Sequence, residues 1–392
     1  MPSRRVIIVM IEPPLPFGNA AARWFYVLLR GLVARGHRVT AFAACSKPSE
    51  IEAAARLFPA PAFDLRLYPF PTRRGLRAKL ETLRRPYSYM FSRDLKRDLV
   101  AELARGCDVL HLEQLWTGRL GLDQSDRAVV NVHHLVQIDQ EFLRPNSPRA
   151  VVERLLSFGT ERRLLRGFRW IRACSPRLEA AIRTINPRAE VVTIPVGIDA
   201  SLYEYIADDR RASEPRITLI GSMLWYPGRS AAERLLTRLW PRIRAAVPAA
   251  RLTIAGWSAR SALARWVDEP GVTIVENVAE TASYFRATSV FVYAPSRGSG
   301  MKIKILEAMA QGVPVVTTSE GVEGLPAVDG VHAGIADDDD GLVERAVELL
   351  RDPSRQNALR AAGRRLIESH CGPQATLDAT EHLYERICRE QR

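Results

Sequence analysis

Short apolar runs alternate with stretches of helical periodicity along most of the 392-residue chain. Residues 6–10 form a continuous apolar run of the kind found in buried parallel strands. Residues 20–34 place Trp24, Val27 and Leu28 at helical spacing. Such alternation is typical of βαβ units, in which helices cover both faces of a parallel sheet. Because the chain is long enough for two cores, we expect an α/β protein with two domains.

The alternation restarts after a charged segment at residues 207–215, which predicts two doubly wound domains. The first would occupy residues 1–205 and the second residues 206–372. Residues 373–392 are helical in pattern, and we expect this helix to pack back toward the first domain. Ligands bind in such folds at the carboxyl ends of the strands. Strands are expected at residues 6–10, 38–43, 109–112, 129–132, 170–173, 191–194, 216–220, 251–255, 272–275, 290–293 and 313–317.

Composition and cysteine content argue against several classes of protein. Hydrophobic residues make up 47% and charged residues 26% of the chain, as in ordinary globular proteins. No apolar run approaches the roughly 20 residues that span a bilayer, and the first run lacks the flanks of a secretory signal. The five cysteines are scattered without metal-ligand or disulfide spacing, which is typical of a reducing compartment. We therefore expect a cytoplasmic protein.

The net charge of +12 is unevenly placed, with a basic cluster at residues 66–97. This basic segment has ten Lys or Arg side chains, two acidic ones and five interleaved aromatic residues. Three explanations are open: a solvated arginine-rich face, binding of nucleic acid, or docking to an anionic membrane surface at about 1 kcal/mol per basic residue. The basic residues are Arg66, Arg73, Arg74, Arg77, Lys79, Arg84, Arg85, Arg93, Lys96 and Arg97.

Residues 296–316 combine a glycine-containing loop, a helix and a buried strand, and they carry the most specific functional signal. The loop offers backbone N–H groups at the start of a helix, together with Lys302 and Lys304. Amide donors, the helix dipole and ammonium groups all favour a diphosphate there. Glu307 follows inside the helix, where its carboxylate can accept hydrogen bonds from sugar hydroxyls. Each residue alone is better explained as a solvated charge, but the whole segment predicts a nucleotide-sugar site.

Three further positions lie where a strand ends. Gly18 lies in the turn after the first strand, His133 directly follows another strand, and Gly221 with Ser222 forms a turn in the second domain. A histidine there can donate a hydrogen bond to a sugar hydroxyl. The Gly-Ser turn can bind a phosphate oxygen, to which Arg229 could add a bidentate contact. Each of these positions also has a purely structural explanation.

The segment from Ser296 to Val316 resembles the donor site of family 4 glycosyltransferases, which are retaining enzymes with the GT-B fold. The resemblance covers nearly the whole chain and is more specific in the second half. It implies two Rossmann-like domains that face each other across a cleft, with the acceptor on the first and the nucleotide-sugar on the second. It also implies a UDP- or GDP-sugar donor and a glycan or lipid-linked acceptor in bacterial surface polysaccharide biosynthesis.

The resemblance assigns roles to individual residues. His133, with His134 as the alternative, would be the catalytic-site histidine that contacts the donor sugar, and Glu307 would bind the ribose. The diphosphate would lie against the two lysines and the Gly-Ser turn. The full donor-binding set is Gly18, Gly221, Ser222, Arg229, Gly300, Met301, Lys302, Lys304 and Glu307.

One departure from the family pattern concerns the glycine-containing loop. Many members have two glutamates spaced by seven residues, the first of which helps to hold the donor sugar. This chain has Ser299 where the first would stand and Glu307 as the second. It matches a subset with a Gly-x-Gly-x-Lys-x-Lys loop, in which the backbone amides of residues 298–301 would take over. The downstream segment at residues 320–325 matches the same subset.

Four consecutive acids at residues 337–340 suggest a metal site, but they cannot all face one ion, and magnesium usually needs a substrate phosphate nearby. Enzymes with the GT-B fold generally use positive side chains and helix dipoles instead. We therefore expect no metal and no cofactor. Because many members glycosylate lipid-linked acceptors, the resemblance favours the membrane explanation of the basic segment, with the protein peripheral at the inner face.

Two alternative functions remain. A sugar-nucleotide epimerase of the same fold would bind the donor and turn it over without an acceptor. A basic nucleic-acid-binding protein would lose affinity steeply with salt, but that function would leave the loop at residues 296–302 unexplained. No nucleic-acid partner is expected.

Overall fold

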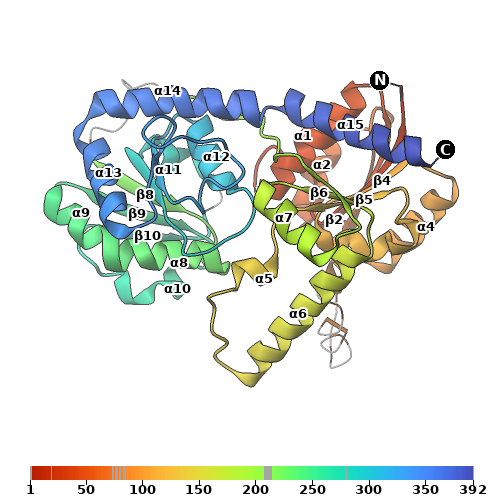
Figure 1. Ribbon diagram of the computed structural model, residues 1–392, viewed down its shortest axis with the longest axis horizontal. Helices are drawn as coiled ribbons and strands as arrows, with labels where there is room; N and C mark the ends of the chain where they lie inside the picture. Colours follow the sequence, from red (N-terminus) through yellow and green to blue (C-terminus); the bar gives the residue numbers. More distant parts are fainter. Residues whose placement is uncertain are drawn as a thin grey trace. The chain divides into compact units, whose positions relative to one another are not determined.

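The computed structural model describes residues 2–18, 20–72, 75, 78, 81–82, 85, 87–206, 214–278 and 280–391. Within these ranges the chain divides into two compact units. Unit 1 comprises residues 1–137, 144–197 and 373–392, and unit 2 comprises residues 138–143 and 198–372. Each unit contains one parallel sheet (Figure 1). Most of the charged segment at 207–215 lies outside the described residues. So do five basic residues of the basic segment: Arg73, Arg74, Arg77, Lys79 and Arg84.

The sheet of unit 1 has seven parallel strands in the order β3-β2-β1-β4-β5-β6-β7. In the centre, Val6 of β1 lies opposite Val39 of β2 and Val109 of β4. The inner strands are almost wholly buried, as their continuous apolar runs predict. The strands are β1 (Arg5–Met10), β2 (Arg38–Cys45), β3 (Asp64–Pro69), β4 (Val109–Leu112), β5 (Ala128–Val132), β6 (Trp170–Ala173) and β7 (Glu190–Thr193).

Helices complete unit 1, and the last helix of the chain is one of them. Helix α15 packs against α1, where Arg35 and His37 both contact the carboxylate of Glu381. The helices are α1 (Ala20–Ala34), α2 (Pro48–Leu57), α4 (Arg93–Ala104), α6 (Pro148–Arg166), α7 (Pro176–Ile185) and α15 (Pro373–Glu390), with the short helices η1 (Ser88–Met90), η2 (Leu115–Leu120) and η3 (Leu122–Gln124). The four-residue α5 (Val136–Asp139) spans the boundary between the units.

The sheet of unit 2 has six parallel strands in the order β10-β9-β8-β11-β12-β13. They are β8 (Arg216–Ile220), β9 (Arg251–Gly256), β10 (Val272–Glu276), β11 (Val290–Tyr293), β12 (Val315–Thr317) and β13 (Gly334–Ile335). Every strand expected from the sequence is present within a few residues, whereas β3 and β13 were not predicted. Strand β3 lies at the sheet edge and is only half-buried, and β13 is two residues long, so neither produces an apolar run.

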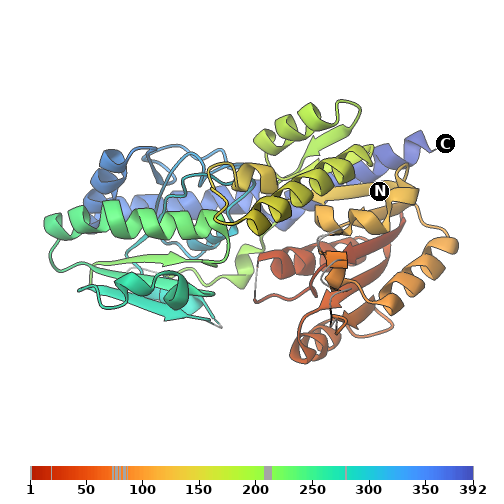
Figure 2. The same cartoon turned by 90° about the horizontal axis from the view of Figure 1, so that it is seen from below.

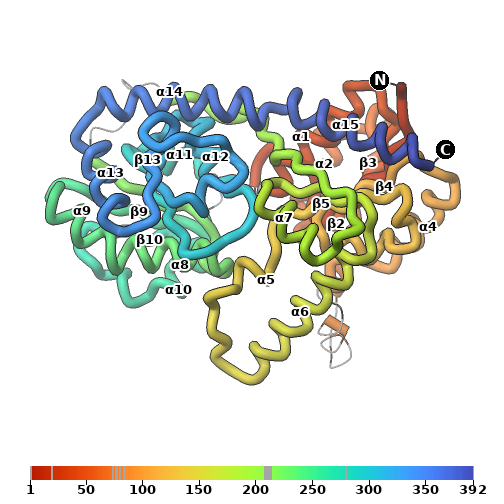
Figure 3. The backbone as a smooth tube through the Cα atoms, viewed as in Figure 1, coloured from red at the N-terminus to blue at the C-terminus, as the bar shows by residue number. Residues whose placement is uncertain are grey.

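Helices surround the second sheet, and Figure 3 traces their order along the chain. Figure 2 shows α8, η6 and α9 as one continuous rod over residues 226–246, with η6 forming a π-helical turn. This rod begins at Tyr226, and Pro227 is accommodated in its first helical turn. The elements are α8 (Tyr226–Arg234), η6 (Leu235–Leu239), α9 (Trp240–Ala246), α10 (Ala259–Ala262), η7 (Ala264–Trp266), α11 (Ala282–Arg286), α12 (Ile303–Ala310), α13 (Asp339–Arg351) and α14 (Pro353–His370), preceded by η4 (Ala200–Leu202).

The strand order reverses between β1 and β4 in unit 1 and between β8 and β11 in unit 2. Parallel sheets of this type bind ligands beside such a reversal, at the carboxyl ends of the strands. Among the helices that the structure describes, none is long and apolar enough to cross a membrane.

We predict that the buried carboxylate of Glu381 fastens α15 to unit 1. Replacing Glu381 by Ala leaves Arg35 and His37 without their shared partner, which should lower the free energy of unfolding by about 1–3 kcal/mol. Asp378 also contacts Arg35, but its side chain is half-exposed, so Asp378→Ala should cost less than about 1 kcal/mol. Urea denaturation of both variants measures the difference, and equal losses would contradict the prediction.

Candidate functional site

The glycine loop of unit 2, defined here as residues 296–302, follows β11 and leads into α12. Gly300 has a positive φ of 70°, a conformation that glycine adopts without strain. The amide and hydroxyl of Ser299 both donate hydrogen bonds to Asp139 Oδ1, at 2.6 and 2.8 Å. The amide of Gly298 donates to Glu320 Oε2 at 3.1 Å. Carboxylates from two separate segments therefore hold the loop in place.

These contacts change one expectation from the sequence. The sequence predicts that the amides of Gly298 and Ser299 take over the role of the missing glutamate toward the donor sugar. In the structure both amides already donate to protein carboxylates, so that expectation is wrong for these two groups. Gly300 and Met301 lie directly before α12, and their role stays a prediction.

Lys302 of the glycine loop is buried in unit 2, and Lys304 of α12 is partly buried there. Lys302 is 7% exposed, donates to the carbonyl of Gly300 and lies 3.7 Å from Glu323. The Lys304 ammonium lies 4.3 Å from the centre of the Tyr293 ring. Burial lowers the pKa of Lys304 to about 8, Lys302 acts in the same direction, and Glu307 opposes the shift. An anion bound here would restore the charged form of Lys304.

The turn after β8 lies against Lys304. A Cβ atom at Gly221 would be 2.5 Å from Lys304 Nζ, so glycine at this position lets the ammonium approach the backbone. A Cβ at Gly256, whose φ is +152°, would be 1.8 Å from the carbonyl oxygen of Gly221. Ser222 follows in the same turn, where its Oγ accepts from the amide of Leu224. The structure thus brings together Gly221, Ser222 and Lys304, which were identified separately in the sequence.

Two other predicted residues lie apart from this cluster. Arg229 is exposed on α8, and its Nε donates to Glu233 at 3.1 Å in an i,i+4 pair. The contacts of the described residues do not join it to the lysines, and its phosphate role stays a prediction. Gly18 follows β1 in unit 1 and has a φ of 86°, and a Cβ added there would meet no described atom within 4 Å.

Glu307 lies on α12, one helical turn after the lysines, and is 9% exposed. The hydroxyl of Tyr203 donates to its Oε1 at 3.2 Å. Because Tyr203 is itself buried, this contact fixes the rotamer of the carboxylate. Lys304 and Glu307 therefore lie three residues apart on the same helix, as the sequence spacing predicted.

In unit 1, His133 belongs to a buried polar network around Glu113, a residue that the sequence analysis missed. Glu113 follows β4 and is fully buried. It accepts hydrogen bonds from Trp24 Nε1 at 3.0 Å and Asn131 Nδ2 at 2.8 Å, and it lies 3.0 Å from His133 Nε2. Burial alone would raise the pKa of Glu113, but His111 and His133 outweigh burial and lower it well below its usual range. An ionised Glu113 therefore orients the His133 ring through Nε2.

Two buried carboxylates, Glu113 and Asp139, were not predicted from the sequence, and only Glu113 had a signal that could have identified it. Glu113 directly follows a strand at its carboxyl end, the same signal that identified His133. Asp139 has no such signal, because it follows no strand and reaches the loop across 160 residues of sequence. Burial raises the pKa of Asp139 to about 6, against the opposing effects of Ser299 and Lys302. His134 is partly buried beside His133.

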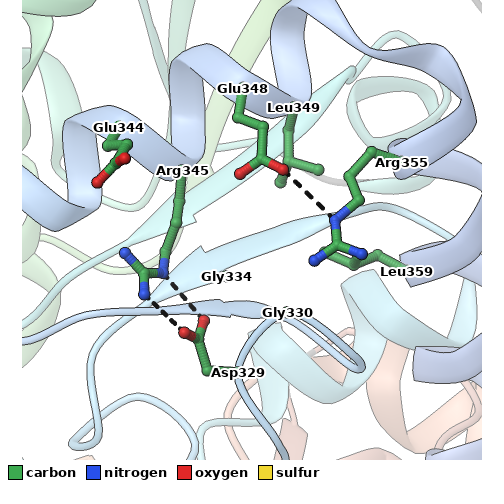
Figure 4. A pocket seen from close by; sticks show the side chains of 9 residues that line it. All are labelled: Asp329, Gly330, Gly334, Glu344, Arg345, Glu348, Leu349, Arg355 and Leu359. Atoms are coloured by element: carbon green, nitrogen blue, oxygen red, sulfur yellow. Dashed lines mark hydrogen bonds and ion pairs between the residues drawn. The ribbon is translucent and has the colours of Figure 1, made fainter.

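A charged pocket elsewhere in unit 2 shares no residue with these clusters (Figure 4). Its volume is about 240 Å³, and four of its five charged residues form two ion pairs, with Glu344 as the fifth. Arg345 forms a bidentate pair with Asp329 at 2.9 and 2.6 Å, and Arg355 lies 3.5 Å from Glu348. Because both arginines of the pocket are paired with carboxylates, the pocket is a weak candidate for binding an anionic ligand.

The four acids at residues 337–340 have structural partners. Asp338 caps α13 by accepting from the amide of Gly341, Asp339 accepts from Arg234, and Asp340 pairs with Arg242. Within the described part of the chain, no group of His, Cys, Asp and Glu side chains has the arrangement of a metal site.

The chain and its two parallel sheets match known proteins. Residues 214–352 match the family model "Glycosyl transferases group 1", and residues 21–202 match "Glycosyltransferase Family 4". The fold is that of GT-B glycosyltransferases. The chain belongs to glycosyltransferase family 4. A comparison with curated protein sequences gave no match.

Solved structures show the same fold at low sequence identity. Sucrose-phosphate synthase from Thermosynechococcus elongatus is 21% identical with a TM-score of 0.73, covering 98% of this chain and 99% of that one. HepE from Anabaena, solved with UDP and glucose, is 14% identical with a TM-score of 0.68, covering 97% and 100%. WaaG, a glycosyltransferase involved in lipopolysaccharide biosynthesis, is 13% identical with a TM-score of 0.66, covering 96% and 99%.

The raised pKa of Asp139 leads to a prediction about pH. Because the native pKa lies above the ordinary value of 3.8, the protonated form is favoured in the folded state, and stability from this group falls as the pH rises from about 4 to about 6. A shift of this size corresponds to about 3 kcal/mol. Asp139→Asn removes the ionisation, so its stability relative to the parent should improve by about 2–3 kcal/mol between pH ~4.5 and pH ~7.5.

Urea unfolding of the parent and Asp139→Asn proteins at both pH values measures this change. Asp268→Asn alters an exposed carboxyl of the same unit. Its free energy of unfolding should differ from that of the parent by the same amount at both pH values. If the stability difference between Asp139→Asn and the parent were also the same at both pH values, the Asp139 carboxylate would not be desolvated as the structure indicates.

Proposed function

We propose that this enzyme transfers a sugar from a nucleotide-sugar donor to an acceptor hydroxyl with retention of anomeric configuration. The observation that carries the proposal is the approach of the Lys304 ammonium to the Gly221 turn, beside Lys302 and the start of α12. Two ammonium groups, a helix N-terminus and a backbone turn together form a site for a diphosphate. The donor would bind to unit 2.

Catalysis would consist mainly of stabilising the departing nucleotide diphosphate. The bond between the anomeric carbon and the diphosphate oxygen breaks, and the acceptor oxygen bonds to the same carbon from the same face. The acceptor proton passes to the departing diphosphate. Lys302 and Lys304 offset the charge that develops on that group, Glu307 accepts hydrogen bonds from the ribose, and His133, oriented by Glu113, donates to the sugar.

The solved structures support a nucleotide-sugar donor, since HepE was also solved with UDP-glucose. UDP- and GDP-sugars are therefore the first donors to test. WaaG acts in lipopolysaccharide biosynthesis, which supports a glycan or lipid-linked acceptor for this chain. Such an acceptor would bind to unit 1, where part of the basic segment lies, and would place the enzyme at the inner face of a membrane.

The donor site is tested by thermal shift with UDP, GDP, ADP, TDP and CDP and their common sugar conjugates. A nucleotide present at about 100 times its Kd stabilises the protein by about 2.7 kcal/mol, so one of them should raise the melting midpoint. In Lys304→Met and Glu307→Gln that nucleotide should bind at least about tenfold more weakly, because each variant removes a charged contact.

Arg238→Ala is the matched control, since Arg238 is an exposed cation of unit 2 that pairs with Asp339. It should bind the nucleotide as the parent does. No shift with any nucleotide, or equal loss in Arg238→Ala, would contradict the proposed donor site. Release of free sugar or an epimer from the donor without an acceptor would favour the epimerase alternative.

A further inference from the structure

The buried network around Glu113 extends beyond His133 to the last helix of the chain, where α15 packs against β4. His111 of β4 lies with its Nε2 3.0 Å from Glu113 Oε1. The hydroxyl of Tyr384, on α15, lies 2.5 Å from His111 Nδ1, and the two rings meet edge to face at 89°. Both side chains are buried. The proposed function uses neither of these two residues.

The direction of these hydrogen bonds follows from the protonation of Tyr384. Burial raises the pKa of Tyr384 well above its ordinary value, and the charge of Glu113 adds to the shift, so the phenol keeps its proton. His111 Nδ1 is the partner of that hydroxyl in the described part of the chain, and the phenol therefore donates to Nδ1. A neutral imidazole then carries its own proton on Nε2, the nitrogen that faces Glu113.

Glu113 joins His111 to His133, because each oxygen of its carboxylate faces one of the two rings. Its Oε1 lies 3.0 Å from both Trp24 Nε1 and His111 Nε2. Its Oε2 lies 2.8 Å from Asn131 Nδ2 and 3.0 Å from His133 Nε2. Burial by itself would raise the pKa of Glu113, and His111 comes first among the neighbours that oppose burial and lower it. Removing His111 therefore makes the ionised form of Glu113 less favourable.

Strand β6 and the residue after it add two further titratable groups to this network. The fully buried guanidinium of Arg172 lies 4.4 Å from the centre of the Trp24 ring, and its Nη2 donates to the carbonyl of Pro195 at 2.8 Å. Burial lowers the pKa of Arg172, and Glu113 opposes that shift. The thiol of Cys174 donates to the carbonyl of His133 at 3.3 Å. Arg172 and Glu113 thus offset each other's charge inside the unit.

His133 is the accessible end of the network. Its side chain is 16% exposed, whereas that of Glu113 is wholly buried. Its Nε2 faces Glu113, and its Nδ1 has no partner among the described residues. An ionised Glu113 therefore keeps a proton on Nε2 and leaves Nδ1 for a ligand. Donation from Nδ1 to the sugar needs the doubly protonated ring, whose charge the ionised Glu113 offsets.

We propose that Tyr384 and His111 are positioning residues for His133 and act on it through Glu113. Tyr384 holds the His111 ring with its Nε2 proton toward Glu113, and His111 helps to keep Glu113 ionised. Glu113 in turn holds a proton on Nε2 of His133. The C-terminal helix α15 would then contribute to the reaction without contacting the donor. The inference rests on the proposed function, because it concerns the histidine assigned there to the donor sugar.

The hydrogen-bond directions are tested by ¹⁵N NMR of the full-length protein labelled at its histidine rings. At about pH 8.5, where an ordinary imidazole is neutral, His111 and His133 should both carry their proton on Nε2. The two sets of signals are identified by their loss in His111→Gln and His133→Gln. Tyr384→Phe removes one neutral hydrogen bond, so it should lower the ratio of Nε2–H to Nδ1–H at His111 about threefold. A proton on Nδ1 of either ring in the parent would overturn the proposal.

The effect on His133 is tested by turnover of the nucleotide-sugar that raises the melting midpoint most in the thermal-shift screen, followed by release of its nucleotide. His111→Leu should lower kcat at least about tenfold and leave KM for the donor within about twofold, since it removes a contact to a charged group outside unit 2. His111→Gln keeps an N–H donor and should restore kcat to within about threefold of the parent. In a Glu113→Gln protein, His111→Leu should have no further effect, because the connection is already broken.

His37→Leu is the matched control, because His37 is another buried histidine of unit 1 that contacts α15, through Glu381. It should leave kcat as in the parent. Equal losses of kcat in His37→Leu and His111→Leu would overturn the proposal in favour of a general loosening of α15. A loss from His111→Leu that is just as large in the Glu113→Gln protein would also overturn it, because His111 would then act independently of Glu113.

These measurements separate the positioning role from the proposed donor site, because the NMR spectra need no nucleotide. His111→Leu should keep the nucleotide-induced thermal shift of the parent, since Lys304 and Glu307 lie in unit 2. The expected ring protons without any nucleotide shift would support the network and contradict the donor site. A nucleotide shift together with a proton on Nδ1 of His111 or His133 would contradict the network and leave the donor site supported.

Discussion

A buried carboxyl group either has neighbours that offset its charge or favours its protonated form, and in each unit one buried carboxyl group organises the predicted site. In unit 1, Glu113 gathers Trp24, Asn131 and His133 around itself at the ends of β4 and β5. In unit 2, Asp139 holds Ser299 of the glycine loop by two hydrogen bonds. The candidate ligand-binding groups therefore owe their positions to carboxylates that need not touch the ligand.

The same principle explains the state of the cations. Lys304 loses hydration beside Tyr293 and Gly221, which makes its charged form more costly in the absence of an anion. The low dielectric that imposes this cost also strengthens its attraction to a bound diphosphate. Arg119 is in a comparable position in unit 1, with like charges as neighbours.

Local and periodic features were predictable from the sequence. The inner strands form continuous apolar runs, and the helix carrying Lys304 and Glu307 follows directly from the spacing around the glycine loop. Strands β3 and β13 escaped prediction because β3 is only half-buried at the sheet edge and β13 is two residues long, so neither forms an apolar run.

The sequence by itself determined the class of fold and the restart of the strand series after the charged segment, and it predicted a nucleotide-sugar site at the glycine loop, because these depend on neighbouring residues and their periodicity. Only the tertiary structure decided which charges are paired. Asp139 reaches Ser299 across 160 residues, Trp24 reaches Glu113 across 89, and Arg119 meets Thr160 across 41. Burial and hydrogen bonding between such distant residues arise only when the sheets have formed and the helices have packed on them.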